Sequence, residues 1–326
     1  MEHRPYRSFF LPVVLIGIGV VWLLGTMGVI PNANFASLAS LWPLIFVVIG
    51  LRILIGGHSA VGSALVGLIT VALVVFFLIA GPSLGLTTSG TLKTERLASD
   101  IGTATVADIT LDFSSQPVAM DALTDKTSLL KGEIDYYGTL NYSESGDKTR
   151  RIRLERSGNS GIPFDWDPNA RWDIELTPNL PIMLTIDGGS GSSDLDLSQL
   201  RLIEFNLDQG SGSLKMQLPA STQPYRAAIT GGSGSMNVAF PSEGDITVRL
   251  NGGSGSINLD IPTGTAVSLE VRSAGSGSVN LPDWLLPDRV YRDGKEGTWK
   301  TAGFDQATHK LTIICDDLGS GSFTIE

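Results

Sequence analysis

The chain has 326 residues, a formal net charge of −10 and a positive mean hydropathy of +0.17. The acidic balance argues against nucleic-acid binding, which needs a basic surface, and the single cysteine excludes an intramolecular disulfide or a multi-cysteine zinc site. Residues 1–80 contain three arginines and one glutamate, so the acidic excess lies in residues 81–326. The sequence therefore predicts an apolar front part and an acidic, water-soluble back part.

Three apolar segments near the start predict a membrane anchor of three helices over residues 1–80. The helices are expected at about 9–30, 36–55 and 60–80, since about 20 apolar residues cross the hydrocarbon core. Pro43 either kinks the second helix or lies in its first turn, and the later start leaves a short span. A cleaved signal peptide competes for the first segment, but its apolar run exceeds the ~7–15 residues of such signals.

The basic residues of the anchor predict its orientation. Arg4 and Arg7 precede the first helix, Arg52 follows the second, and the loop between these helices has no basic residue. The positive-inside rule then places the N-terminus in the cytoplasm. Three crossings make the protein a multi-pass protein of the cell membrane with an extracytoplasmic C-terminal domain. A re-entrant second segment would place that domain in the cytoplasm instead.

The back part contains an internal repeat. Residues 81–98 are rich in Gly, Ser and Thr and indicate a linker, 99–166 an irregular β capping section, and 167–326 the repeats. The tetrapeptide Gly-Ser-Gly-Ser begins at Gly189, Gly210, Gly232, Gly253, Gly275 and Gly319. The spacing is 21 or 22 residues, and the last interval is two periods. A fixed period of this size is typical of stacked-repeat proteins.

Each repeat predicts two strands. In one copy, Ile203, Phe205 and Leu207 alternate before the tetrapeptide, and apolar residues alternate again after it. Period-2 alternation buries one face of a strand, and stacked rungs complete one another's core. We therefore expect a β-solenoid with rungs of 21–22 residues. The glycines are expected at a bend without room for a side chain, with the serines outward as a ladder.

The missing copy of the repeat predicts a local irregularity. Gly297–Lys300 falls where that copy would lie, 22 residues after Gly275. The charged segment Asp283–Glu296 before it is expected to be an inserted loop.

The sequence predicts no catalytic, cofactor or metal residues, and hence no enzyme. Gly-Ser-Gly-Ser lacks the lysine and helix of a phosphate-binding loop. A serine nucleophile needs a nearby base, and His309, the sole histidine of the back part, is expected at an exposed edge. Cys315 occupies an inward strand position and is expected to be a small buried hydrophobe.

Two groups of residues leave alternatives open. Asp187, Asp194, Asp196 and Asp208 cluster around the first rungs. Asp194 and Asp196 share one face of a strand, with their side chains about 7 Å apart. This arrangement would allow Ca²⁺ binding or acid–base catalysis. The equivalent positions of later rungs hold other residues, however, and this favours a solvated face. Phe164, Trp166 and Trp172 either stack on sugars or close the end of a core.

Two stretches resemble known envelope families. Leu15-Ile16-Gly17-Ile18-Gly19-Val20, then Leu41-Trp42-Pro43-Leu44-Ile45 leading to Ile49-Gly50-Leu51, is similar to the LiaI/LiaF-type transmembrane region over residues 9–56. The segment from Trp172-Asp173-Ile174-Glu175-Leu176 through the Gly-Ser-Gly-Ser rungs resembles the toast-rack domain of LiaF-like and adhesin-like proteins. The resemblance implies a prokaryotic envelope protein without catalytic residues, and LiaF-type proteins restrain a membrane sensor kinase.

The sequence thus predicts a membrane-anchored, all-β solenoid protein that is not an enzyme. Its expected partners are the lipid bilayer and a membrane sensor kinase or other envelope protein, whose envelope-stress signalling it senses or modulates. A surface adhesin or glycan-binding module is the alternative function. A solenoid enzyme acting on polysaccharides through Asp194 and Asp196 is the least favoured.

Overall fold

The computed structural model describes residues 9–26, 43–51, 53, 60–80, 92–113, 116–157, 170–291 and 294–326. These residues form a helical unit and a β unit. The described helices are α1 (Phe10–Thr26), α3 (Pro43–Leu51) and α4 (Ala60–Ala80), and α3 begins at Pro43, a first-turn position that tolerates proline. Within the described ranges, no helix has both the length and the hydropathy of a membrane-crossing helix.

In the helical unit, α1 packs against α4 through small residues. Gly67 lies against Val13, because a Cβ built on Gly67 would stand 3.1 Å from the Val13 Cβ. Gly17 lies in the same way against Val71 of α4. Ser63 of α4 accepts a hydrogen bond from the backbone N–H of Phe9 at 3.0 Å. Small residues at these positions let the two helix backbones approach closely.

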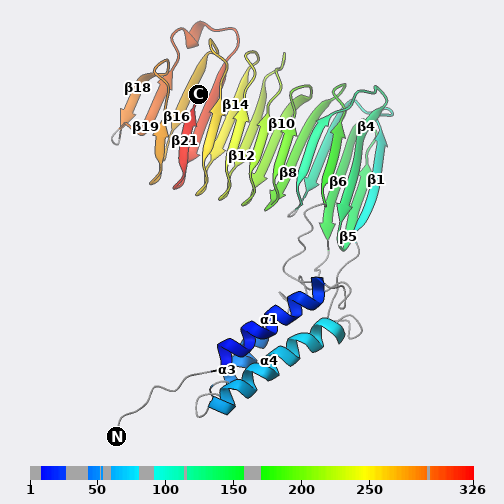
Figure 1. Ribbon diagram of the computed structural model, residues 1–326. Coiled ribbons are helices and arrows are strands. Elements are labelled where there is room, and N and C mark those ends of the chain that lie inside the picture. Colours follow the sequence, from blue (N-terminus) through cyan, green and yellow to red (C-terminus); the bar gives the residue numbers. More distant parts are fainter. Residues whose placement is uncertain are drawn as a thin grey trace. The chain divides into compact units, whose positions relative to one another are not determined.

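The β unit consists of two sheets that enclose one apolar core (Figure 1). In its described residues, sheet A contains, in spatial order, β1 (Lys93–Asp100), β4 (Ser128–Tyr136), β7 (Trp172–Leu176), β3 (Val118–Ala122), β9 (Ser193–Asp196), β11 (Leu214–Gln217), β13 (Met236–Ala239), β15 (Ile257–Asp260), β21 (Ser322–Ile325) and β17 (Ser278–Asn280). Sheet B contains β18 (Leu286–Tyr291), β19 (Glu296–Lys300), β16 (Val267–Val271), β20 (Leu311–Asp317), β14 (Ile246–Asn251), β12 (Tyr225–Thr230), β10 (Arg201–Gln209), β8 (Pro181–Gly189), β2 (Val106–Asp112), β6 (Thr149–Ser157) and β5 (Thr139–Ser145).

The repeats form rungs with one strand in each sheet, as the sequence predicts. The strands of successive rungs pair in parallel and in register, for example Leu214 with Met236, and Met236 with Ile257. The alternating apolar side chains are buried between the sheets, with Phe205 and Val238 at most 1% exposed. Ile203 is an exception: the alternation predicts it inward, but it is 38% exposed, because the register shifts between Leu202 and Glu204 and Leu202 is buried instead. A single rung cannot cover the two edges of its apolar inward face, so burial of this face depends on the adjacent rungs.

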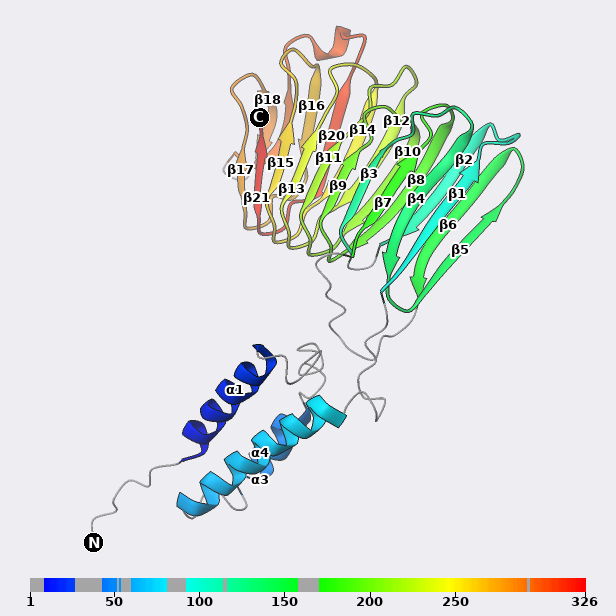
Figure 2. The same cartoon turned by 45° about the vertical axis from the view of Figure 1, so that its right-hand side comes forward.

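The spatial order of the rungs differs from their order in the chain. The last rung, β20–β21, lies between β14–β15 and β16–β17 (Figure 2). At the other end, β2–β3 lies between β6–β7 and β8–β9. The section over 99–166, expected to be an irregular cap, therefore contributes a regular rung. The interval of two periods before Gly319 arises because the chain turns back to insert its last rung.

Antiparallel strands stand where the sequence predicts the missing copy and its loop. Gly297–Lys300 lies in β19, which pairs antiparallel with β16. The expected loop Asp283–Glu296 contains β18, the outer strand of the hairpin with β19. β1, which pairs antiparallel with β4, includes residues 93–98 of the expected linker.

A carboxylate joins the two sheets at the end formed by β1 and β5. The hydroxyls of Ser99 in sheet A and Tyr142 in sheet B both donate to the Glu144 carboxylate, at 2.8 and 2.7 Å. The Arg150 guanidinium lies 3.2 Å from the same group. Burial, assisted by the hydrogen bond to Glu144, raises the pKa of Tyr142 to about 12. The cluster links the edge strands where the stack ends.

The tetrapeptide glycines bring neighbouring rungs into backbone contact. A Cβ built on Gly234 would lie 1.9 Å from the carbonyl oxygen of Gly212, and one on Gly255 would lie 1.7 Å from that of Gly234. The second glycines of all six tetrapeptides form one such column. The predicted lack of room is confirmed, but the obstruction is the adjacent rung along the stack and not the core. Only glycine tolerates so close a backbone approach.

Candidate functional site

The serines of the tetrapeptides form the expected ladder on the surface. The first serine of every copy is exposed, and hydroxyls of adjacent rungs contact each other at two places, Ser213 with Ser192 at 3.2 Å and Ser320 with Ser254 at 3.3 Å. The neighbouring outward positions of sheet A are also polar, and the Asn258 amide donates to that of Asn237 at 2.8 Å. This edge presents hydroxyl and amide groups and stays polar along the stack.

The aspartates singled out in the sequence do not converge. The Asp194 carboxylate is exposed and lies 3.6 Å from the Lys215 ammonium on the next rung. Asp196 instead accepts the backbone N–H of Ser198 at 3.0 Å. Asp187 and Asp208 face each other in register on sheet B, the other sheet. Among the described residues, no group of three or more potential metal ligands gathers.

Of the three aromatic residues considered for sugar stacking, the structure describes Trp172. Trp172 is fully buried, packs edge-on against Phe113 with ring centroids 5.4 Å apart, and donates its indole N–H to the Asp135 carbonyl. It therefore closes the core. Phe164 and Trp166 lie outside the described residues.

The two reactive residue types of the back part occupy the expected environments. Cys315 is fully buried in β20, and burial raises the pKa of its thiol well above the usual range. His309 is exposed and lies two residues before the start of β20. Neither residue has the surroundings of a nucleophile or a base.

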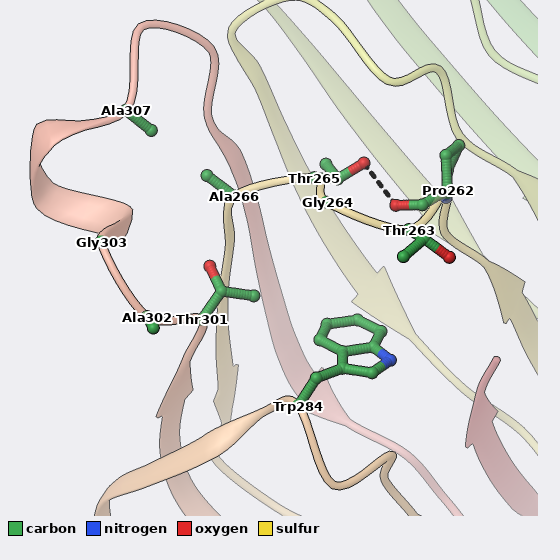
Figure 3. Close-up of a pocket in the computed structure, with 10 residues that line it drawn as sticks. All are labelled: Pro262, Thr263, Gly264, Thr265, Ala266, Trp284, Thr301, Ala302, Gly303 and Ala307. Atoms are coloured by element: carbon green, nitrogen blue, oxygen red, sulfur yellow. Dashed lines mark hydrogen bonds between the residues drawn. The ribbon is translucent and has the colours of Figure 1, made fainter.

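A hollow of about 380 Å³ lies beside Trp284, a residue that the sequence reasoning missed (Figure 3). Trp284 belongs to the segment between β17 and β18, and its indole extends toward the turn between β15 and β16, Pro262–Ala266. The other wall comes from Thr301–Ala307, which follows β19. Trp284 is 39% exposed, so a large part of its side chain is accessible to solvent.

The lining of this hollow is neutral. All ten lining residues are uncharged, and most are threonine, alanine or glycine. Thr265 donates its hydroxyl to the Pro262 carbonyl at 2.7 Å, and the Thr301 hydroxyl accepts the Val267 backbone N–H at 2.9 Å, so both side chains are held in place. An exposed aromatic face beside fixed hydroxyls and small residues suits a neutral, hydroxylated ligand.

The repeat pattern does not predict a role for Trp284. It lies in the insertion after Pro282 and Asp283, outside both strand patterns. Its neighbours Leu285 and Leu286 are apolar, so the local sequence does not mark Trp284 as a surface residue. Its pocket exists because three turns separated by up to 45 residues lie at the same end of neighbouring rungs.

Two family models match the sequence. Residues 9–54 match the LiaI-LiaF-like transmembrane region, and residues 88–239 match the N-terminal domain of toast_rack, DUF2154. No curated protein shows a significant match. The family matches agree with the resemblance seen in the sequence motifs.

Two solved structures share similarity with the chain. One is a candidate cell adhesion protein from Clostridium sporogenes, with 17% identity, a TM-score of 0.50 and coverage of 72% of this chain and 99% of that protein. The other is a candidate adhesin from Bacteroides fragilis, with 12% identity, a TM-score of 0.30 and coverage of 73% and 98%. The similarity to the Clostridium sporogenes structure supports the β-solenoid fold.

These findings define a membrane-associated β-solenoid protein. More particularly, the chain is similar to LiaF-like proteins, because a match to the LiaI-LiaF-like transmembrane region precedes a match to the N-terminal domain of toast_rack. The matched families and neighbours are LiaF-like or adhesin-like.

Proposed function

We propose that this protein is a non-enzymatic, multi-pass membrane protein that senses envelope stress or modulates a membrane signalling partner. Its N-terminus is cytoplasmic, and its β-solenoid stands outside the membrane. The observation that carries the proposal is the joining of a LiaI-LiaF-like transmembrane region to a toast-rack domain in one chain. A membrane sensor kinase is the partner that this combination favours.

The architecture of the β unit supports a docking role. Its rungs share one continuous core, and contact between backbones fixes their spacing at the glycine columns. Such a unit is stiff and presents side chains at fixed positions. A stiff body held at the membrane acts by contact with a neighbour, and this suits a modulator of another membrane protein.

The proposal is tested with a membrane-impermeant, thiol-specific photo-crosslinker on intact cells. Thr222→Cys places a thiol at an exposed position in the turn between β11 and β12. We expect labelling of this variant in intact cells and photo-adducts that contain a polytopic protein with a kinase domain. The wild-type chain is the matched control, because its only thiol, Cys315, is fully buried and should stay unlabelled.

Two results would contradict the proposal. Labelling of Thr222→Cys only after the cells are lysed would place the solenoid in the cytoplasm. Adducts without any signalling protein, together with an unchanged envelope-stress response after deletion of the gene, would remove the signalling role.

A second candidate function, binding of a surface glycan, is favoured by the Trp284 hollow. Its size, about 380 Å³, lies at the small end of ligand pockets, and its neutral lining suits a single sugar ring at a chain end or branch. The exposed indole face would stack on that ring, while Thr263 and the fixed threonines offer hydroxyl groups. This role is compatible with an extracytoplasmic solenoid.

A glycan array probed with the full-length protein in detergent tests this candidate. We expect Trp284→Ala to reduce binding at least about tenfold, because an aromatic anchor carries much of the energy of a small site. Tyr291→Ala is the matched control, since Tyr291 is an exposed aromatic on the neighbouring β18 but does not line the hollow. An array without any bound glycan, or equal loss in both variants, would exclude the site.

A further inference from the structure

In the described residues, the two sheets of the β unit have four edge strands, and three of them are protected against pairing with another chain. An unpaired edge exposes backbone donors and acceptors, so proteins protect such edges with charge, proline, bulges or short strands. β18 contains Pro287 and a register shift after it. β17 is three residues long, and the Lys295 ammonium covers the adjacent Gly277 carbonyl at 3.0 Å. β1 carries Lys93 and Arg96 at exposed positions and has a register shift near its end.

β5, the remaining edge strand, lacks such protection. It is seven residues long and pairs with β6 over its whole length without a register shift. It contains no proline, lysine or arginine. Among the described residues, no strand pairs with its other side, and it lies at the end of sheet B in Figure 2. A long and regular edge of this kind is suited to the addition of another strand.

The apolar side chains of β5 are incompletely covered. Leu140 and Tyr142 both pack against the core, yet both are only half-buried. By contrast, Leu154, which stands opposite Tyr142 on β6, is fully buried. The Tyr142 hydroxyl already donates to Glu144, so the ring is the part of this side chain that remains to be covered. One more strand beside β5 would bury both side chains.

The edge of β5 is neutral, whereas the chain as a whole is acidic. Its outward positions hold uncharged polar residues, namely Thr139, Asn141, Ser143 and Ser145. Glu144 is the one charged residue of the strand, and its carboxylate lies 3.2 Å from the Arg150 guanidinium. Two copies of a chain with a net charge of −10 repel each other. A neutral edge is therefore a place where they can meet.

We propose that the β5 edge pairs with β5 of a second copy of this chain, so that sheet B continues across a two-fold axis. Identical edges related by such an axis pair antiparallel, and the residue on the axis meets its own copy. With the axis at Asn141, Leu140 of each copy stands opposite the partner's Tyr142. Thr139 then stands opposite the partner's Ser143. Apolar residues meet on the core side and polar residues meet outside, and such cross-strand pairs stabilise a sheet.

Disulfide trapping in membranes of the expressing cells tests this pairing with the full-length chain. Asn141→Cys places two thiols at the axis, where directly opposite residues lie within reach of a disulfide. We expect mild oxidation to give a covalent dimer of this variant. Ser145→Cys is the matched control, because it lies on the same face of β5 but about 27 Å from its own copy in this register. Cys315 is fully buried and should not react in either variant.

A second measurement weakens the pairing by charge. Asn141→Lys sets two ammonium groups opposite each other at the axis, and like charges placed in this way destabilise a strand pair. In light scattering of the full-length protein in detergent, we expect the wild type to have the mass of two chains. Asn141→Lys should raise the dissociation constant about fivefold or more. Ala228→Lys is the control and should leave the dimer intact, since Ala228 is exposed on β12, which is paired on both sides.

Four results would overturn the proposal. Equal yields of covalent dimer from the two cysteine variants would show collision without a fixed register. A wild-type protein with the mass of one chain would exclude the dimer. An unchanged dissociation constant in Asn141→Lys would place the contact between copies elsewhere, for example between the helices. A mixed disulfide of Asn141→Cys with a different protein would show that the edge has another occupant.

Discussion

Gly234→Ala is expected to unfold or severely destabilise the β-solenoid. The added methyl carbon would stand 1.9 Å from the carbonyl oxygen of Gly212 on the adjacent rung and 2.5 Å from its carbonyl carbon. Both atoms belong to the backbone, so neither can rotate away, and the two rungs would have to separate. Overpacking of this kind costs about 3 kcal/mol or more. Urea unfolding of the full-length protein in detergent, followed by the far-UV signal of the strands, measures the loss.

Ser233→Ala provides the matched control for this prediction. Ser233 precedes Gly234 in the same tetrapeptide, and its side chain is exposed. Its replacement should leave the free energy of unfolding within about 0.5 kcal/mol of the wild type, as for most surface substitutions. If Gly234→Ala unfolded at the wild-type urea concentration, the rungs would not be in backbone contact at this column.

The second large effect is expected from Phe323→Ala in the inserted rung. Phe323 is 1% exposed, and its strand β21 pairs with β15 on one side and β17 on the other. Its replacement should lower the free energy of unfolding by about 3–5 kcal/mol. Because the rung lies between two others, the damage should spread to both. Hydrogen exchange should show faster exchange of backbone amides in Ile257–Asp260 and Ser278–Asn280.

The exchange pattern separates the inserted arrangement from a stack in chain order. Rungs laid down in chain order would place Phe323 at the end of the stack, beside β17 alone, and Ile257–Asp260 would keep its protection. Phe240→Ala is the control, because Phe240 is a buried phenylalanine that follows β13. It should increase exchange around β13 and leave Ser278–Asn280 protected.

Several features of the fold could be predicted because they depend on local pattern. The alternation of Ile246, Val248 and Leu250 marks a strand with one buried face, and such strands form the rungs. The fixed interval between tetrapeptides requires that equivalent residues stack, which places the glycines in columns and the serines outside. The buried state of Cys315 follows from its phase in the same pattern.

Other features depend on which strands become neighbours. The period requires stacking but does not specify the order of the rungs, since parallel rungs of one period present nearly interchangeable edges. β20–β21 could therefore enter between two rungs formed by earlier parts of the chain. For the same reason the segment Gly297–Lys300, which has the right spacing for a rung, became an antiparallel strand.

The candidate sites follow the same division. The exposed serine ladder and the solvated Asp194 could be expected from their positions in the strand alternation, because alternate residues of a strand face opposite sides. The Trp284 hollow needs three turns from separate parts of the chain. The sequence by itself determined the two-part chain, the acidic back and the rung of 21–22 residues. Only the tertiary structure decided the order of the rungs and the Trp284 hollow, because both result from contacts between segments far apart in the chain.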